Sequence, residues 1–123
     1  MATTDQKDPR AFLPLKPDVF MILTILAGEE RHGYGIMQEA GERSGGRIRL
    51  QAGALYRRLK WMLDQGFIRE TAPPSASEGE GERRRYYQVT SFGRRVAEAE
   101  ARRMAELLSA ARRAALIRDP AGP

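Results

Sequence analysis

The chain has no cysteine, a single histidine and no long apolar run. Without cysteine, neither a disulfide framework nor a thiolate metal site can form. The absence of cysteine is also compatible with a protein that works in a reducing compartment. The longest apolar stretch covers residues 19–27, includes Thr24, and is far too short to span a bilayer. Residues 1–9 are polar and carry Asp5 and Asp8, unlike a signal peptide. We therefore expect a cytoplasmic protein with no membrane partner.

The single histidine also limits the chemistry that the chain can perform. His32 lies beside a glycine, and no second titratable group is placed to orient it as a general base. One histidine and scattered carboxylates do not form a metal-ligand cluster. His32 better suits the start of a helix or a phosphate contact. We therefore expect no enzyme activity, no metal site and no cofactor.

The length and composition indicate one small domain. The chain has 123 residues, of which 41% are hydrophobic and 30% are charged, so the core that it can bury alone is modest. We expect a flexible tail over residues 1–13, a folded domain over 14–90, a long helix over 91–117 and a second flexible tail over 118–123. A partner subunit would add to the buried surface.

The basic residues are concentrated in one segment. The net charge is +5, and between Arg43 and Lys60 there are six basic residues and no acidic one. These six are Arg43, Arg47, Arg49, Arg57, Arg58 and Lys60. A local field of one sign attracts a polyanion such as DNA. A solvated basic face is the alternative interpretation.

Two helices are expected before this basic segment. Pro17 and Asp18 open the run VFMILTILAG, which is apolar nearly all round and ends at Gly28, as a buried central helix would. The run YGIMQEAGERSGG has apolar residues at helical spacing and ends near residues 44–46. Residues 48–51 form a short link, for which a strand paired with a later hairpin is one option.

A third helix follows, with two different faces. Gly66 ends this helix, and its apolar stripe consists of Leu55, Leu59, Met62 and Leu63. The opposite face is basic, and a recognition helix enters the major groove with its N-terminal end first. The side chains that we expect to face DNA are Gln51, Ala52, Gly53, Arg57 and Lys60. Gln51 can pair with a base edge, and Arg57 can contact guanine or a phosphate.

A β-hairpin with a long loop is expected after the third helix. Residues 67–71 and 85–90 have strand periodicity, and the loop APPSASEGEGE between them has no core-forming residue. Arg83, Arg84 and Arg85 at the base of this wing suit contact with the phosphate backbone. The acidic residues at the tip repel phosphate, so we place the contact at the base; local pairing of these acids with the arginines is the alternative.

The last helix has an a/d seam of small and apolar residues. Ser91 is placed to cap it, and the seam consists of Ala97, Ala101, Met104, Leu108, Ala111 and Ala115. A lone exposed helix would gain little from such a stripe. The pattern indicates packing against the same helix of a second subunit, hence a homodimer. Packing back onto the protein's own domain is the alternative, and the two can coexist.

Four ordered motifs carry a family resemblance: HGYGI at 32–36, GALY at 53–56, QGFI at 65–68 and RRRYYQVTSFG at 83–93. With these, the chain resembles the winged-helix domain of PadR-family transcriptional regulators, in the smaller subgroup with a single C-terminal helix. The resemblance implies a mainly α fold with a small β-hairpin, and a homodimer that represses transcription from a pseudo-palindromic operator. It also implies DNA-facing positions for Tyr34, Gly53, Tyr56, Arg84 and Arg85.

The chain departs from the family pattern at several positions. Ala54 and Arg57 stand where members commonly have threonine and proline, so the base preference cannot be transferred. Ala101 and Met104 stand where drug-sensing members have aromatic side chains, which argues against stacking of a planar drug. A small-molecule effector is left open. The rival interpretation is a ligand-sensing or protein-binding winged-helix dimer that does not read DNA.

Overall fold

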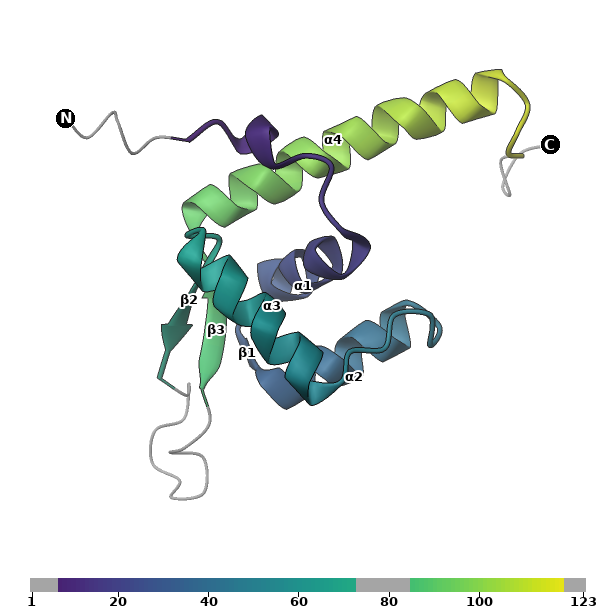
Figure 1. The fold of residues 1–123 in the computed structure, drawn as a ribbon. Coiled ribbons are helices and arrows are strands. Elements are labelled where there is room, and N and C mark those ends of the chain that lie inside the picture. The colour runs from purple at the N-terminus through teal and green to yellow at the C-terminus, as the bar shows by residue number, and fades with distance from the viewer. Residues whose placement is uncertain (1–6, 73–84, 119–123) are drawn as a thin grey trace.

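We describe residues 7–72 and 85–118 of the chain in a computed structural model. Four α-helices, one short 3-10 helix and a small sheet form this described part (Figure 1). The elements are η2 (Pro9–Phe12), α1 (Pro17–Gly28), β1 (Arg31–His32), α2 (Gly33–Arg43), α3 (Ala52–Asp64), β2 (Ile68–Thr71), β3 (Tyr86–Val89) and α4 (Ser91–Arg113). The expected mainly α fold with a β-hairpin and a long last helix is confirmed.

Helix α1 lies at the centre of the hydrophobic core. Pro17 begins the helix, where its missing N–H is not needed, and the side chain of Asp18 accepts a hydrogen bond from the backbone N–H of Val19 at 2.8 Å. Its buried residues are Val19, Ile22, Leu23, Ile25 and Leu26. Because these point in several directions around the axis, α1 contacts α2, α4 and β3. The expected buried helix is confirmed.

The sheet has three antiparallel strands in the order β1-β3-β2. Glu70 of β2 lies opposite Tyr87 of β3, and His32 of β1 lies opposite Tyr86. The strand considered for residues 48–51 is therefore wrong, because Arg31 and His32 occupy the second edge of β3. Residues 48–51 are instead an irregular link to α3, with no strand.

The N-terminal segment corrects the expected tail over residues 1–13. Residues 9–12 form η2, which Asp8 caps by accepting a hydrogen bond from the N–H of Arg10 at 2.9 Å. The ring of Phe12 contacts Phe67 and Phe92 edge-on, at centroid distances of 5.0 and 5.9 Å. In Figure 1 this segment crosses α4. Aromatic packing therefore fixes residues that look like a polar tail in the sequence; residues 1–6 lie outside the described residues.

Helix α4 begins and ends slightly differently from the expectation. The side chain of Thr90, not Ser91, accepts the capping hydrogen bond, from the N–H of Gly93 at 2.9 Å. The helix ends at Arg113, and Ala115 has a φ of 63°, in the left-handed region. The seam residue Ala115 is therefore beyond the helix, which corrects the predicted end at residue 117. Residues 119–123, expected as a tail, are outside the described part of the chain.

Candidate nucleic-acid interface

Helix α3 has the two faces that its sequence predicts. The side chains of Leu55, Leu59 and Met62 are buried in the core. The opposite side chains of Arg57 and Lys60 are exposed to solvent. Because the buried stripe fixes the rotation of the helix about its axis, the basic face must point away from the domain. In Figure 1, α3 runs from beside α2 to the end of β2 that lies near the start of α4.

The first turn of α3 is open to a large ligand. Gln51 is the N-cap residue, but its side chain makes no capping hydrogen bond, so its amide is free to meet a base edge. Ala52 and Gly53 are exposed, and a Cβ on Gly53 would have only the guanidinium of Arg57 within 4 Å, at 3.6 Å. The three residues predicted to lie nearest the bases therefore form an unobstructed end of the helix.

Ion pairs divide the six basic residues between Arg43 and Lys60 into two groups. Arg58 of α3 bonds Asp18 of α1 at 2.7 Å, Arg43 bonds Glu39 at 3.1 Å, and Lys60 approaches Asp64 at 3.5 Å. The Lys60 pair is largely exposed, so it holds the lysine only weakly. Over residues 7–72 and 85–118, no ion pair engages the other three. These uncompensated cations are Arg47, Arg49 and Arg57.

An aromatic group connects the start of α2 with α3. The Nδ1 atom of His32 accepts a hydrogen bond from the N–H of Gly35 at 3.1 Å, which confirms its role at a helix start. The ring of Tyr34 lies parallel to His32 at a centroid distance of 6.5 Å and is 57% exposed. Tyr56, 49% exposed, reaches back from α3 to Gly33. Tyr34 and Tyr56 are thus both exposed side chains at the start of α2: Tyr34 belongs to its first turn, and Tyr56 packs against Gly33 beside it.

Gly33 is a position whose role the sequence reasoning missed. A Cβ there would overlap the Tyr56 hydroxyl and lie 2.9 Å from the ring carbon that bears it. Only glycine lets the tyrosine ring pack this closely against the backbone. The glycine directly after His32 was the available signal. Any side chain at residue 33 would displace the Tyr56 ring from the start of α2.

The base of the hairpin contributes one described arginine. The guanidinium of Arg85 donates to Glu70 on the neighbouring strand at 3.2 Å, and the two side chains are 71% and 41% exposed. This exposed pair leaves Arg85 accessible to a phosphate. Arg83, Arg84 and the acidic tip of the wing lie outside the described residues.

Comparison with known proteins gives the family. Residues 22–99 match the profile of the Transcriptional regulator PadR-like family. The chain belongs to this family. PadR-type proteins are transcriptional regulators that bind DNA, and they are not enzymes. No curated protein matches the chain.

Solved structures of several transcriptional regulators share the fold. A PadR family regulator from Clostridium difficile is 22% identical with a TM-score of 0.67, over 80% of this chain and 97% of that one. A PadR-like regulator from Bacillus cereus is 21% identical with a TM-score of 0.66, over 81% and 92%. A transcriptional regulator from Clostridium thermocellum is 17% identical with a TM-score of 0.65, over 85% and 90%.

The described part of the chain has neither a metal-ligand cluster nor a membrane-spanning helix. No group of three or more histidine, cysteine, aspartate or glutamate side chains within residues 7–72 and 85–118 could hold a metal ion. Among these residues there is also no helix long and apolar enough to cross a membrane.

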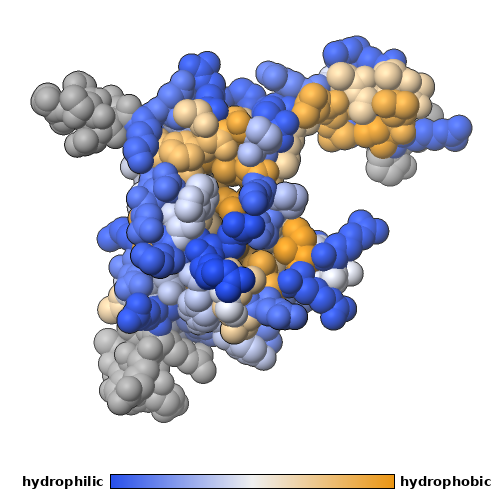
Figure 2. Space-filling model, in the orientation of Figure 1, coloured by the Kyte–Doolittle hydropathy of each residue, from blue (hydrophilic) through white to orange (hydrophobic). Residues whose placement is uncertain are grey.

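The seam of α4 divides into two parts in this PadR-type structure. Ala97 packs against the core of its own domain, as the alternative interpretation expected. Farther along, Met104, Leu107 and Leu108 are 37%, 57% and 42% exposed. In Figure 1 the end of α4 projects beyond the domain, and Figure 2 shows hydrophobic surface there. The distal half of α4 therefore carries apolar side chains that its own chain does not cover.

Proposed function

We propose that this PadR-type protein is a homodimeric repressor that binds a pseudo-palindromic operator. In each subunit, α3 enters the major groove with Gln51, Ala52 and Gly53 foremost, and Arg57 contacts a base or phosphate. The observation that carries the proposal is the exposed Arg57 beside an open helix start, with no ion pair among the described residues to compete for its charge.

Further contacts surround the base-reading helix in this proposal. Tyr34, Tyr56 and Lys60 border the exposed face of α3, and the arginines at the wing base, Arg83 to Arg85, lie against the sugar–phosphate backbone. For Tyr34 and Tyr56 the support is their exposure; for Arg85 it is an exposed, weakly held guanidinium. Arg83 and Arg84 are included in the proposal only because they belong to the family motif.

The distal half of α4 supplies the subunit contact. Met104, Leu108 and Ala111 lie within one arc of the helix, and the first two are exposed in the isolated chain. Burial of this arc against the same helix of a second copy would remove apolar surface from water. A two-fold pair of winged helices would then match a two-fold operator.

Release by a small molecule is included in the proposal. A cavity of about 340 Å³ borders α3, and its lining includes Phe12, Val19, Arg58 and Trp61. This volume lies at the small end of the range of ligand pockets, about 300–1,000 Å³. A molecule bound there would touch the recognition helix directly, so its occupancy could alter how α3 meets DNA.

The experiment is a binding titration with DNA fragments that the purified protein itself retains. Arg57→Ala and, separately, Arg84→Ala should each weaken binding about tenfold or more while sedimentation still shows dimers. Arg102→Ala, an equal charge change on the exposed surface of α4, serves as the control. Unchanged affinity for both test variants would refute the proposal. A wild-type protein that binds no DNA at low salt would favour the rival dimer that does not read DNA.

A further inference from the structure

The segment between α2 and α3 carries two arginines that the proposed interface does not use. Eight residues, 44–51, separate the end of α2 from the start of α3, whereas a helix-turn-helix commonly has about three or four. Within this long turn, Arg47 and Arg49 make no ion pair with any described residue. We call these two residues and the backbone that carries them the basic turn.

The turn presents both arginines to solvent because the apolar residues that alternate with them, Ile48 and Leu50, are anchored. Ile48 and Leu50 are half-buried and pack against the hydrophobic core, whereas Arg47 and Arg49 are exposed. Two apolar anchors facing inward therefore force the two guanidinium groups outward.

Hydrogen bonds hold the turn in one shape. The backbone N–H of Ile48 donates to the Ser44 hydroxyl at 2.8 Å, and the side chain of Arg49 donates to the carbonyl oxygen of Gly46 at 3.0 Å. Gly45 and Gly46 have φ values of 65° and 85°, a conformation that suits glycine. The Arg49 guanidinium is thus pre-positioned, which lowers the entropy lost when it binds a phosphate, whereas only the backbone at Arg47 is held.

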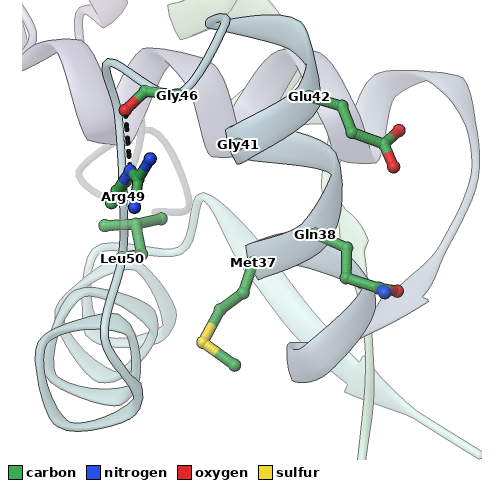
Figure 3. Close-up of a pocket in the computed structure, with 7 residues that line it drawn as sticks. All are labelled: Met37, Gln38, Gly41, Glu42, Gly46, Arg49 and Leu50. Carbon is green, nitrogen blue, oxygen red and sulfur yellow. Dashed lines mark hydrogen bonds between the residues drawn. The ribbon is translucent and has the colours of Figure 1, made fainter.

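Arg49 also lies over a groove that continues the proposed DNA surface. The groove, with a volume of about 410 Å³, runs between α2 and the turn (Figure 3). Gln38 lines it, and the Gln38 amide approaches the hydroxyl of Tyr34 at 3.5 Å, so the groove adjoins the surface of Tyr34. Glu42 is the one acidic side chain in its lining and would oppose an anion.

We infer that the basic turn is a second DNA-contact surface, which binds the sugar–phosphate backbone beside the bases that α3 reads. The inference rests on the proposed operator binding. Arg49 is two residues before Gln51, the N-cap of α3, so a duplex seated on that helix start passes close to the turn. The turn contacts phosphate and not the bases, because only the start of α3 is placed to enter the major groove of the DNA.

The test is the salt dependence of DNA binding by Arg47→Ala/Arg49→Ala, measured by fluorescence anisotropy on the retained fragment and on unrelated DNA. Each lost phosphate contact should reduce the slope of log affinity against log salt by about 0.9, hence by about 1.8 for the pair in one subunit and about 3.6 for the dimer. Affinity should fall by the same factor on both DNAs, because phosphate contacts carry no sequence information. Glu42→Gln should strengthen binding to both.

The matched control is Arg102→Ala/Arg113→Ala, which removes two exposed arginines from α4 and should leave the slope unchanged. Arg47→Ala alone guards against misfolding, because its side chain makes no hydrogen bond within the described residues; it should lower the slope by about 0.9 for each subunit, about 1.8 for the dimer. A wild-type slope retained in both test variants would overturn the inference while operator binding stood. No salt-dependent binding by the wild type would instead overturn the proposed function.

Discussion

Among the described residues, Glu100 is the one charged side chain that is fully buried. One carboxylate oxygen accepts hydrogen bonds from the N–H of Leu15 at 3.1 Å and from Arg103 at 2.9 Å, and the other accepts from Arg103 at 2.6 Å. These bonds tie the N-terminal segment to α4. A glutamate in a charge-rich helix carries no sign in the sequence that it will be buried.

We expect Glu100→Ala to destabilise the protein by about 1–3 kcal/mol, because the Leu15 N–H and the Arg103 guanidinium would lose their acceptor. Glu106→Ala, which removes an exposed carboxylate from the same helix, is the control and should change stability by less than about 0.5 kcal/mol. Urea denaturation at one fixed protein concentration measures both. Equal midpoints for the two variants would contradict this role.

The hydrogen bonds of Glu100 also predict that the stability of the fold depends on pH. The hydrogen bonds from Arg103, and then that from the Leu15 N–H, hold the pKa of Glu100 below its ordinary value of 4.5, against the opposing effect of burial. A carboxyl whose pKa is lower in the folded state stabilises the fold above its unfolded pKa and loses that contribution as the pH falls through the folded one. The stability gap between wild type and Glu100→Gln should therefore narrow below about pH 4.5.

At the scale of elements, the junction between α4 and the hairpin depends on a close backbone approach. The carbonyl oxygen of Phe67 accepts a hydrogen bond from the N–H of Thr90 at 2.9 Å, and a Cβ on Gly93 would overlap that oxygen. The start of α4 can therefore approach β2 this closely only with glycine at residue 93.

We expect Gly93→Ala to cost about 1–3 kcal/mol, because α4 would have to move away from the Phe67 backbone. Gly41→Ala is a matched control on α2: a Cβ there meets nothing within 4 Å, and the change should stabilise the helix by up to about 1 kcal/mol. Thermal unfolding by circular dichroism compares the two. A Gly93→Ala protein at least as stable as the wild type would show that the junction tolerates a side chain.

At the scale of the whole molecule, the distal half of α4 is an apolar surface without a partner in the single chain. Leu108→Glu places a charge on this surface, and we expect monomers in sedimentation velocity because burying an unpaired carboxylate is costly. Operator affinity should fall by roughly 10²–10⁴-fold, because the two half-sites would no longer be bound as one unit. Ser109→Glu, about 100° around the helix from Leu108 and outside the arc of Met104, Leu108 and Ala111, should remain dimeric. A dimeric Leu108→Glu protein would contradict the proposed contact.

Local patterns in the sequence predicted most of the elements of the fold. The spacing of Leu55, Leu59 and Met62 predicted the inward face of α3, and Pro17 and Gly28 predicted both ends of α1. These predictions succeed because helical periodicity and terminal residues act over only a few positions. The basic outer face of α3 followed from the same arithmetic.

Contacts between distant residues could not be read in the same way. The pairing of Arg58 with Asp18 joins residues 40 positions apart, and the pairing of His32 with Tyr86 makes a third strand that lacks a strand-like run of its own. Likewise, Phe12 belongs to the folded domain and not to the expected tail, because its ring packs against Phe67 and Phe92. Contacts of this kind depend on which surfaces of the chain meet in the folded protein.

The sequence by itself determined the order of the elements, the amphipathic recognition helix and the concentration of cations before and within it. Only the tertiary structure decided which of those cations remain free: Asp18 and Glu39 engage Arg58 and Arg43, while Arg47, Arg49 and Arg57 have no such partner among the described residues. The physical reason is that charge is a property of each residue, whereas compensation of that charge depends on distances that folding alone sets.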